Sequence, residues 1–330
     1  MVDRKRVLSG MRPTGPLHMG NYLGALKNWV QMQAEYDCFF FVADWHALTS
    51  DYESPGPMGQ YVRQIVIDWL SAGLSPQKST IFVQSRIPEH AELFLILAMI
   101  TPVSWLERNP TYKDQIVQLR SKDLSTFGFL GYPVLQAADI IMYKAQGVPV
   151  GVDQVPHVEI TREIARRFNH LYGPLFPEPE AILTETPRIL GLDRRKMSKS
   201  YGNAIYLADS PHEVQTKVKQ MVTDPQRARR GDPGNPDICN VFEFHKLHTA
   251  VTTTRKIDKA CRAAEIGCVE CKKIMALKLL EALEPMHAKR AYYLEHPEIV
   301  EQVIVEGSLK ARAIARETME QVKTALKIES

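Results

Sequence analysis

The sequence predicts an α/β fold in which a doubly wound, parallel sheet is followed by an all-helical domain. Short apolar runs alternate with helical patterns in the first half of the chain, which is typical of βαβ units. Beyond about residue 205 these runs give way to helical spacing alone. Because 330 residues are enough for two domains, we expect an α/β domain over 1–205 and a helical domain over 206–330.

The predicted strands are short and apolar, as in a parallel sheet that is covered on both faces. The run CFFFVA at 38–43, for example, contains apolar residues throughout. The expected strands are 7–11, 38–43, 80–84 and 148–150. The expected helices are 21–35, 61–70, 90–100 and 157–168 in the first domain, and 211–221, 271–289 and 309–327 in the second.

The composition excludes several classes of protein. Apolar residues make up 45% of the chain and charged residues 24%, which is ordinary for a globular protein. The apolar, uncharged stretch at 93–106 has 14 residues, whereas a bilayer span needs about 20. The first twelve residues lack the apolar core of a signal peptide. We therefore expect a cytoplasmic protein that does not enter a membrane.

A Gly/Pro turn, TGPLHMGN at 14–21, follows the first predicted strand. A strand, a tight turn and a helix in this order aim backbone N–H groups at a phosphate. Gly15 and Gly20 would allow the backbone to approach a ligand closely. His18, where the helix is expected to begin, could donate to a phosphoryl oxygen. This motif alone is a modest signal, because a single histidine beside a glycine turn is more often structural.

A second motif, KMSKS at 196–200, contains two lysines beside small hydroxyl residues. On a loop, such a segment suits a mobile clamp that stabilises the charge of a departing pyrophosphate. The surrounding stretch 191–230 holds nine Lys and Arg against four Asp and Glu. This excess of positive charge suits phosphates or a nucleic-acid backbone, and the alternative is a solvated charged surface.

The two motifs together resemble the signatures of class I aminoacyl-tRNA synthetases. The resemblance to the bacterial tryptophanyl-tRNA synthetases extends from about residue 6 to the C-terminus. It is carried by SGMRPTG at 9–15, DWHALT at 44–49, YPVLQAAD at 132–139, GVDQVPH at 151–157 and RRFN at 166–169. It implies a Rossmann-like catalytic domain that ends in the KMSKS loop, an anticodon-binding helical domain, and a homodimer.

The resemblance implies a tryptophan–tRNA ligase. Such an enzyme activates L-tryptophan with Mg-ATP, releases pyrophosphate, and transfers tryptophan from the adenylate to the 3′-terminal adenosine of tRNA(Trp). No covalent enzyme intermediate is implied, so the protein supplies positioning and charge stabilisation. The alternatives are a tyrosine–tRNA ligase within the family, and a small-molecule nucleotidyltransferase or an iron–sulfur nucleic-acid-binding protein outside it.

The family's functional residues are carried over position by position. The catalytic residues would be His18, Asn21, Lys196 and Lys199. The ATP site would also include Arg12, Thr14, Gly15, Gly20, Gly151, Asp153, Met197 and Ser198. Tryptophan would be bound by His46, Tyr132, Gln136, Asp139 and Gln154. Two of these residues depart from the family pattern, because many members carry Gln at position 12 and Met at position 136.

Within the tryptophan site, Asp139 would accept the indole N–H. The spacing of Tyr132, Gln136 and Asp139 places the three side chains on one helix face. Polar groups on the face of an otherwise apolar helix more often line a pocket than a core. The structural alternative is that Asp139 forms an ion pair or a cap, and that His46 is a core histidine.

Four of the five cysteines lie close together in the sequence, at Cys239, Cys261, Cys268 and Cys271. A Cys-x2-Cys pair at a helix start places two thiols on one side of a metal and lowers the pKa of the thiols. Four thiols within one short stretch of chain suit a [4Fe–4S] cluster or Zn²⁺.

The cysteine spacing resembles that of the bacterial tryptophanyl-tRNA synthetases that carry a [4Fe–4S] cluster in the C-terminal domain. The resemblance implies a structural role near the anticodon-binding region, away from the chemistry. Four unligated thiols, or a mixed zinc site with His245 or His248, are the alternatives.

Overall fold

The computed structural model describes residues 4–119, 122–183 and 189–328, and the chain forms two compact units. The sheet unit comprises Met1–Gly15, Asn28–Glu185 and Tyr293–Ser330. The helical unit comprises Pro16–Lys27 and Thr186–Tyr292. The units differ from the expected boundary at 205/206 in three places, because 16–27 and 186–205 belong to the helical unit and 293–330 belongs to the sheet unit.

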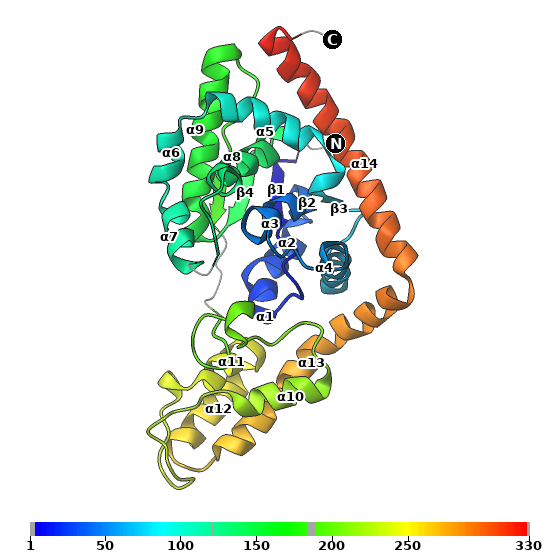
Figure 1. The fold of residues 1–330 in the computed structure, drawn as a ribbon. Helices are drawn as coiled ribbons and strands as arrows, with labels where there is room; N and C mark the ends of the chain where they lie inside the picture. The colour runs from blue at the N-terminus through cyan, green and yellow to red at the C-terminus, as the bar shows by residue number, and fades with distance from the viewer. Residues whose placement is uncertain (1–3, 120–121, 184–188, 329–330) are drawn as a thin grey trace. The chain divides into compact units, whose positions relative to one another are not determined.

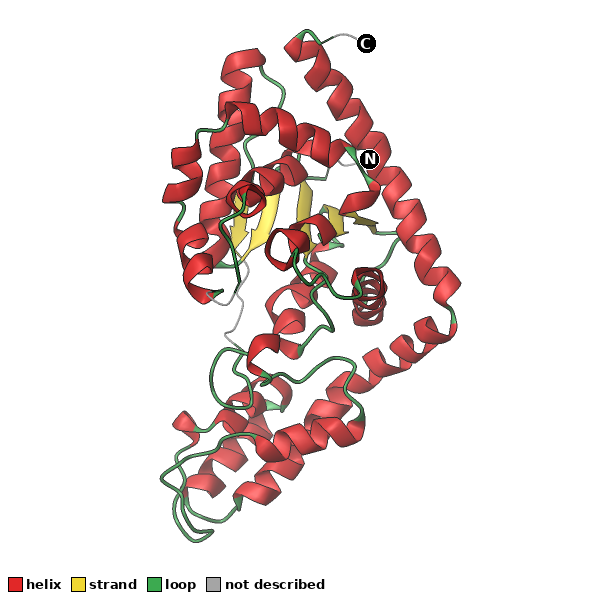
Figure 2. Cartoon of the chain, in the orientation of Figure 1, coloured by secondary structure: helices red, strands yellow, loops and turns green. Residues whose placement is uncertain are grey.

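The sheet unit is built on five parallel strands in the order β3-β2-β1-β4-β5 (Figures 1 and 2). Their bounds are Arg6–Met11 (β1), Asp37–Val42 (β2), Ser79–Val83 (β3), Gly147–Val150 (β4) and Glu180–Leu183 (β5). The strand order reverses between β1 and β4, which is the switch point of a doubly wound sheet. The predicted fold class is confirmed, and the four predicted strands correspond to β1–β4.

Helices cover both faces of the sheet. On one face, Trp29 stacks on Phe40 with ring centroids 4.7 Å apart and meets Trp69 edge-on. On the other face, Phe39 and Phe82 belong to a core that α5, α8, α9 and α14 complete. The helices of this unit are α2 (Lys27–Met32), α3 (Asp44–Asp51), α4 (Met58–Ala72), α5 (Glu89–Ile100), α6 (Val103–Arg108), α7 (Pro110–Gln118), α8 (Phe127–Met142), α9 (Val155–Tyr172) and α14 (Pro297–Leu326).

The helix α14 lies along β3, far from it in the sequence (Figure 1). A Cβ atom on Gly307 would lie 1.8 Å from the carbonyl oxygen of Ile81, so only glycine allows this approach. The Ser308 hydroxyl accepts a hydrogen bond from the backbone N–H of Val83 at 3.4 Å. Because of these contacts, the helix predicted over 309–327 completes the α/β unit, although its sequence neighbours belong to the helical one.

The helical unit contains helices and loops among its described residues, with isolated bridges in place of strands. Its elements are α1 (Met19–Asn21), the π-helix η1 (Tyr22–Leu26), the 3₁₀-helix η4 (Lys199–Tyr201), α10 (Pro211–Gln220), the 3₁₀-helix η5 (Pro236–Ile238), α11 (Asn240–His248), α12 (Val251–Arg262) and α13 (Cys268–Glu295). In the part of the chain that the structure describes, no helix has the length and apolar character that crossing a bilayer requires.

Candidate substrate and ATP sites

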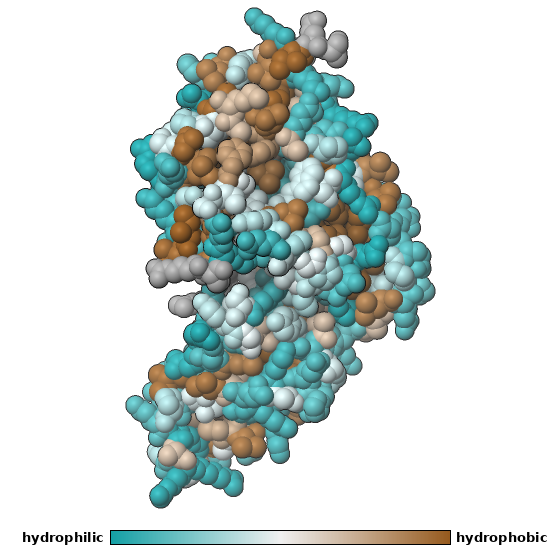
Figure 3. All heavy atoms as spheres, viewed as in Figure 1, coloured by the Kyte–Doolittle hydropathy of each residue, from teal (hydrophilic) through white to brown (hydrophobic). Residues whose placement is uncertain are grey.

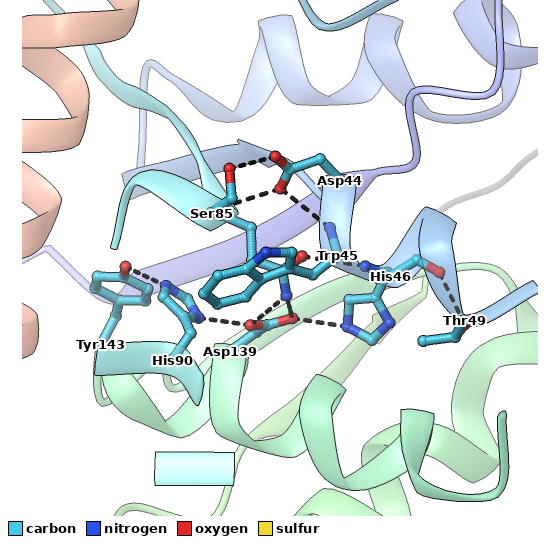
Figure 4. A network of polar contacts seen from close by, with 9 residues as sticks. Asp44, Trp45, His46, Thr49, Ser85, His90, Asp139 and Tyr143 are labelled. Atoms are coloured by element: carbon cyan, nitrogen blue, oxygen red, sulfur yellow. Dashed lines mark hydrogen bonds and ion pairs between the residues drawn. The ribbon is translucent and has the colours of Figure 1, made fainter. Parts of the chain in front are cut away.

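Asp139 on α8 is the centre of a buried polar network in the sheet unit (Figure 4). Its carboxylate accepts hydrogen bonds from Gln84 Nε2 at 2.8 and 2.9 Å, from His46 Nε2 at 2.8 Å and from His90 Nδ1 at 2.5 Å. The other ring nitrogen of His90 lies 2.7 Å from the Tyr143 hydroxyl. A buried carboxylate with this many donors is an oriented, ionised acceptor.

Two groups of this network, Asp139 and Tyr143, have shifted pKa values. Burial opposes ionisation of Asp139, but the charges and hydrogen bonds of His90 and His46 outweigh it, so the pKa of this carboxyl is lowered. Burial, together with Asp139 and Glu89, raises the pKa of Tyr143 well above its ordinary value. Tyr143 therefore keeps its proton, and its hydroxyl contacts one ring nitrogen of His90 while the other contacts Asp139.

Two short elements place the donors around Asp139. The Asp44 carboxylate, at the start of α3, accepts hydrogen bonds from the Ser85 N–H at 3.0 Å and from the Ser85 hydroxyl. Ser85 lies in the 3₁₀-helix η2 (Gln84–Arg86), directly after β3. The backbone N–H of His46 also donates to Gln84 Oε1 at 3.3 Å. These contacts hold η2 against α3, so that Gln84 and His46 reach the same carboxylate.

Tyr132 and His157 form a second buried pair. The Tyr132 hydroxyl lies 3.1 Å from His157 Nε2, and Asn109 Nδ2 lies 3.4 Å from His157 Nδ1. Burial, with a further contribution from His46, lowers the pKa of His157 to about 4. The ring is therefore neutral at pH 7, and it accepts from the Asn109 amide and donates to the Tyr132 oxygen.

The remaining predicted residues of the sheet unit lie near the ends of its strands. The 3₁₀-helix η3 (Val152–Gln154) follows β4. It contains Asp153 and Gln154, and Gly151 directly precedes it. In such sheets ligands bind at the carboxyl ends of the strands. The backbone carbonyl of Asp153 accepts from the Thr111 hydroxyl at 3.0 Å.

The loop after β1 holds three further residues of the predicted ATP site. Arg12 Nη1 donates to the Ser50 hydroxyl at 3.2 Å, and the Thr14 N–H donates to the Arg12 carbonyl at 2.9 Å. Gly15 has a φ of 112°, which favours glycine. On α8, Gln136 is half-buried on the same helix as Asp139.

In the helical unit, His18 caps the short helix α1. Its Nδ1 accepts from the Asn21 N–H at 3.3 Å, and the Asn21 side chain accepts from the His18 N–H at 3.1 Å. Burial, with Lys199 and Lys196 nearby, lowers the pKa of His18 to about 4. The neutral ring therefore carries its proton on Nε2. A side chain at Gly20 would lie 2.9 Å from this ring, so the turn requires a residue without one.

The KMSKS segment is held by Asn203. Its Oδ1 accepts from the Ser198 N–H at 2.9 Å, and its Nδ2 donates to the Lys196 carbonyl at 3.2 Å and to Asp193 Oδ1 at 2.7 Å. A Cβ atom on Gly191 would lie 2.2 Å from the Asn203 side chain. The amide of Asn203 thus fixes the backbone on either side of Met197, which is 4% exposed.

The KMSKS segment and the turn that contains His18, both predicted to bind phosphates, lie side by side within the helical unit. Met19 N–H donates to the Ile205 carbonyl and Leu207 N–H to the Leu17 carbonyl, each at 2.9 Å. A Cβ atom added to Gly20 would lie 3.6 Å from Met197 Cβ, so the two segments are in close contact at this point. His18 and the KMSKS lysines therefore share one electrostatic environment, although almost 180 residues separate them in the sequence.

The four clustered cysteines lie at the adjoining ends of α11, α12 and α13. Burial and the other three thiols raise the pKa of Cys271 to about 12, and burial also raises the pKa of Cys239 and Cys261. The expected lowering of the thiol pKa at the Cys-x2-Cys pair is therefore wrong for Cys271, because burial outweighs the effect of the helix start. Arg227 Nη1 lies 3.8 Å from Cys261 Sγ and 3.9 Å from Cys268 Sγ.

The predicted metal site at these cysteines is not confirmed. Over residues 4–119, 122–183 and 189–328, no group of three or more His, Cys, Asp and Glu side chains is placed to hold a metal ion. The thiols are free of disulfides, and a guanidinium already contacts two of them. His245 Nε2 lies 3.5 Å from Cys271 Sγ.

Several residues of these sites escaped the sequence analysis. In the sheet unit they are Asp44, Gln84, Ser85, His90, Asn109, Thr111 and Tyr143, and in the helical unit they are Gly191, Asp193 and Asn203. Gln84 had a usable signal, because it directly follows a predicted strand, where ligand-site residues gather. Asn203 had another, because it lies three residues after the KMSKS segment.

A family model described as tRNA synthetases class I (W and Y) matches residues 3–284. The chain belongs to this family of class I tRNA synthetases. It is 53% identical to the tryptophan–tRNA ligase of Thermotoga maritima, over 98% of this chain and 99% of the relative. It is 47% identical to that of Aquifex aeolicus, over 98% of this chain and all of the relative.

Solved structures of class I synthetases share the fold. A tryptophanyl-tRNA synthetase from Campylobacter jejuni, complexed with ADP and tryptophan, is similar with a TM-score of 0.88 and 34% identity. The match covers 98% of this chain and 99% of that one. A tyrosyl-tRNA synthetase from Archaeoglobus fulgidus has a TM-score of 0.66 at 19% identity, which shows the common fold alone.

Proposed function

We propose that the protein is a tryptophan–tRNA ligase, which activates L-tryptophan with ATP and esterifies tRNA(Trp) with it. The observation that carries this proposal is the meeting of His18 with the KMSKS lysines in one unit, in a chain 53% identical to a ligase of that name. A neutral imidazole donor beside two ammonium groups suits a polyphosphate, because the developing charge on pyrophosphate meets donors that are already in place.

In this proposal the tryptophan carboxylate attacks the α-phosphorus of ATP, and the bond to the pyrophosphate oxygen breaks. His18 Nε2–H donates to a phosphate oxygen, while Asn21 holds the ring and the first turn of α1. Lys196 and Lys199 stabilise the leaving pyrophosphate. Mg²⁺, which enters with the ATP phosphates, would neutralise part of their charge. Gly20, Met197 and Ser198 belong to the two backbone segments that carry these side chains, and they allow the phosphates to approach the backbone closely.

The sheet unit supplies the tryptophan contacts. We assign the indole acceptor role to Asp139, because a buried, ionised carboxylate rejects side chains that lack a donor at that place. His46, Tyr132, Gln136 and Gln154 would surround the ring and the ammonium group. Arg12, Thr14, Gly15, Gly151 and Asp153 would contact ATP from the ends of β1 and β4.

The test is ATP–pyrophosphate exchange with each amino acid in turn, followed by charging of tRNA(Trp). Exchange should depend on tryptophan, and tRNA(Trp) should be charged. Exchange with tyrosine but not tryptophan would overturn the specificity, and exchange with no amino acid would overturn the ligase proposal.

We further propose that Cys239, Cys261, Cys268 and Cys271 bind a [4Fe–4S] cluster, with Zn²⁺ as the alternative. The support is that the other three thiols lie close enough to Cys271 to raise its pKa, and that Arg227 supplies a counter-charge for an anionic cluster. Such a cluster would brace the ends of α11, α12 and α13. Anaerobically purified protein should hold iron and sulfide, whereas a colourless protein with one zinc per chain would overturn the iron–sulfur version.

We also propose a homodimer, formed through α5 and the start of α6. Apolar side chains gather over α5 on the face seen in Figure 3. Leu95, Met99 and Val103 are 56%, 74% and 54% exposed, which is unusual for side chains that lie close together. Met99→Glu should turn a particle of twice 37.4 kDa into a monomer in light scattering, whereas Leu171→Glu on α9 should not. A monomeric unmodified protein would overturn the proposal.

A further inference from the structure

The carboxylate of Asp139 is fully occupied by donors from the described residues. Gln84 Nε2 reaches both oxygens, His90 Nδ1 reaches Oδ1, and His46 Nε2 reaches Oδ2. A carboxylate offers about four acceptor positions, and four contacts are made here. An indole N–H that binds Asp139 must therefore take the place of one of these donors.

The three donor side chains differ in how firmly they are held. Gln84 is 0% exposed and is also tied through Oε1 to the backbone of α3. The His90 side chain is 0% exposed and is held at its second nitrogen by Tyr143. The His46 side chain is 11% exposed, so it alone of the three reaches the surface. His46 is accordingly the donor that an incoming ring meets first.

We propose that His46 is an exchangeable donor whose place on Asp139 Oδ2 is taken by the indole N–H of tryptophan. This inference rests on the proposed role of Asp139 in tryptophan binding. In the free enzyme, Nε2–H of His46 keeps the buried carboxylate satisfied. When tryptophan binds, one N–H···O hydrogen bond breaks and another forms, and no proton is transferred.

The exchange explains how the site selects a ring that carries a donor. A ring without an N–H displaces His46 and leaves a buried, ionised oxygen with one donor fewer. Loss of a hydrogen bond to a charged group weakens binding by about 10- to 100-fold. A tryptophan analogue with a benzothiophene ring, which has the shape of indole but no N–H, should therefore bind that much more weakly.

Removal of His46 distinguishes exchange from an ordinary pocket contact. If His46 leaves when tryptophan binds, His46→Ala loses its hydrogen bond in the free enzyme alone. The free variant should then melt at a lower temperature than the unmodified enzyme, and this difference should shrink with saturating tryptophan. If the hydrogen bond from His46 to Asp139 persisted in the complex, the difference would remain when tryptophan is bound. His46→Gln, which keeps a side-chain N–H of similar reach, should restore the melting temperature of the free enzyme.

The direct test is proton NMR of the full-length enzyme with ¹⁵N-labelled histidine. His46→Ala and His90→Gln identify the two ring N–H signals that are hydrogen-bonded to Asp139. Saturating tryptophan should remove or shift the His46 signal and leave the His90 signal in place. An unchanged His46 signal with bound tryptophan would overturn the exchange while leaving the ligase proposal intact. Failure of tryptophan to bind at all would instead count against the proposed function.

Discussion

His18 Nδ1 accepts a hydrogen bond from the backbone N–H of Asn21 at 3.3 Å, and the Asn21 side chain accepts one from the His18 N–H at 3.1 Å. This reciprocal pair fixes which ring nitrogen carries the proton. It therefore makes His18 Nε2 a donor in the resting protein, before any phosphate arrives.

Replacement of His18 by Ala should lower kcat for tryptophan-dependent ATP–pyrophosphate exchange by about 10²- to 10³-fold, because a pre-placed donor to the developing charge is lost. His212→Ala, at an exposed position at the start of α10, serves as the matched control. Equal activity of the two variants would remove His18 from the phosphate site.

Lys199→Ala should lower kcat for exchange more than it raises KM for ATP, since its charge would act on the departing pyrophosphate. The control is Lys219→Ala, which removes an exposed lysine from α10. Asn203→Ala should show a weaker version of the Lys199 effect, because it frees the backbone that carries the KMSKS segment. If Lys199→Ala changed KM alone, the charge would serve ground-state binding.

The free energy of unfolding should fall as the pH drops from about 6.5 to about 4. Burial lowers the pKa of His18, His157 and His248 to about 4, whereas the unfolded chain takes up these protons near pH 6.5. Between these values the unfolded state binds more protons, so acid favours it. Buried His157, for example, contributes up to about 3 kcal/mol by this route. Urea unfolding at pH 7.5, 6 and 5 measures the loss, and His157→Gln should reduce it; a flat profile would contradict the assignment.

Double replacement of Cys268 and Cys271 by Ser should leave tryptophan-dependent exchange within a few-fold of the unmodified enzyme and reduce charging of tRNA(Trp) more strongly. The reason is that the thiols lie at the ends of α11, α12 and α13, where they contact Arg227 and His245, neither of which is assigned to ATP or tryptophan. Circular dichroism establishes that the variant is folded. A collapse of exchange in a folded variant would place the cysteines in the chemistry.

Gly307→Ala should destabilise the protein by about 1–3 kcal/mol, because the new methyl group meets the Ile81 carbonyl and must displace α14. Gly59→Ala offers a matched control, since a Cβ there meets no atom within 4 Å and alanine suits a helix better than glycine. Thermal unfolding of both variants would be compared, and a Tm for Gly307→Ala equal to that of the unmodified protein would contradict the close approach.

Much of the fold could be predicted because its signals are local. The run at 38–43 is apolar from end to end, and it forms β2 in the middle of the sheet. The strand β5 escaped prediction because it has four residues, two of them exposed, at the edge of the sheet. The place of α14 also escaped, because helical spacing shows that a helix has an apolar face but not which surface that face will meet.

The same distinction holds at the candidate sites. His18 and the KMSKS segment could be predicted because contiguous residues carry the chemistry. The donors to Asp139 come from α3, η2 and α5. The resemblance predicts His46, whereas Gln84 and His90 are single polar residues outside any motif. Their common target exists only once distant segments have packed together. A single sequence therefore indicates the acceptor, whereas the structure is needed to identify what surrounds it.

The position of α14 has a consequence for biosynthesis. The strand β3 leaves the ribosome about 200 residues before the helix that packs along it. Until residues 293–328 have been made, this edge of the nascent sheet is open to pairing with other chains. The helical unit, whose residues precede them, can meanwhile fold. A nascent chain stalled before α14 is thus the form of this protein that a chaperone would need to shield, and release of the completed sheet unit is tied to translation of its last helix.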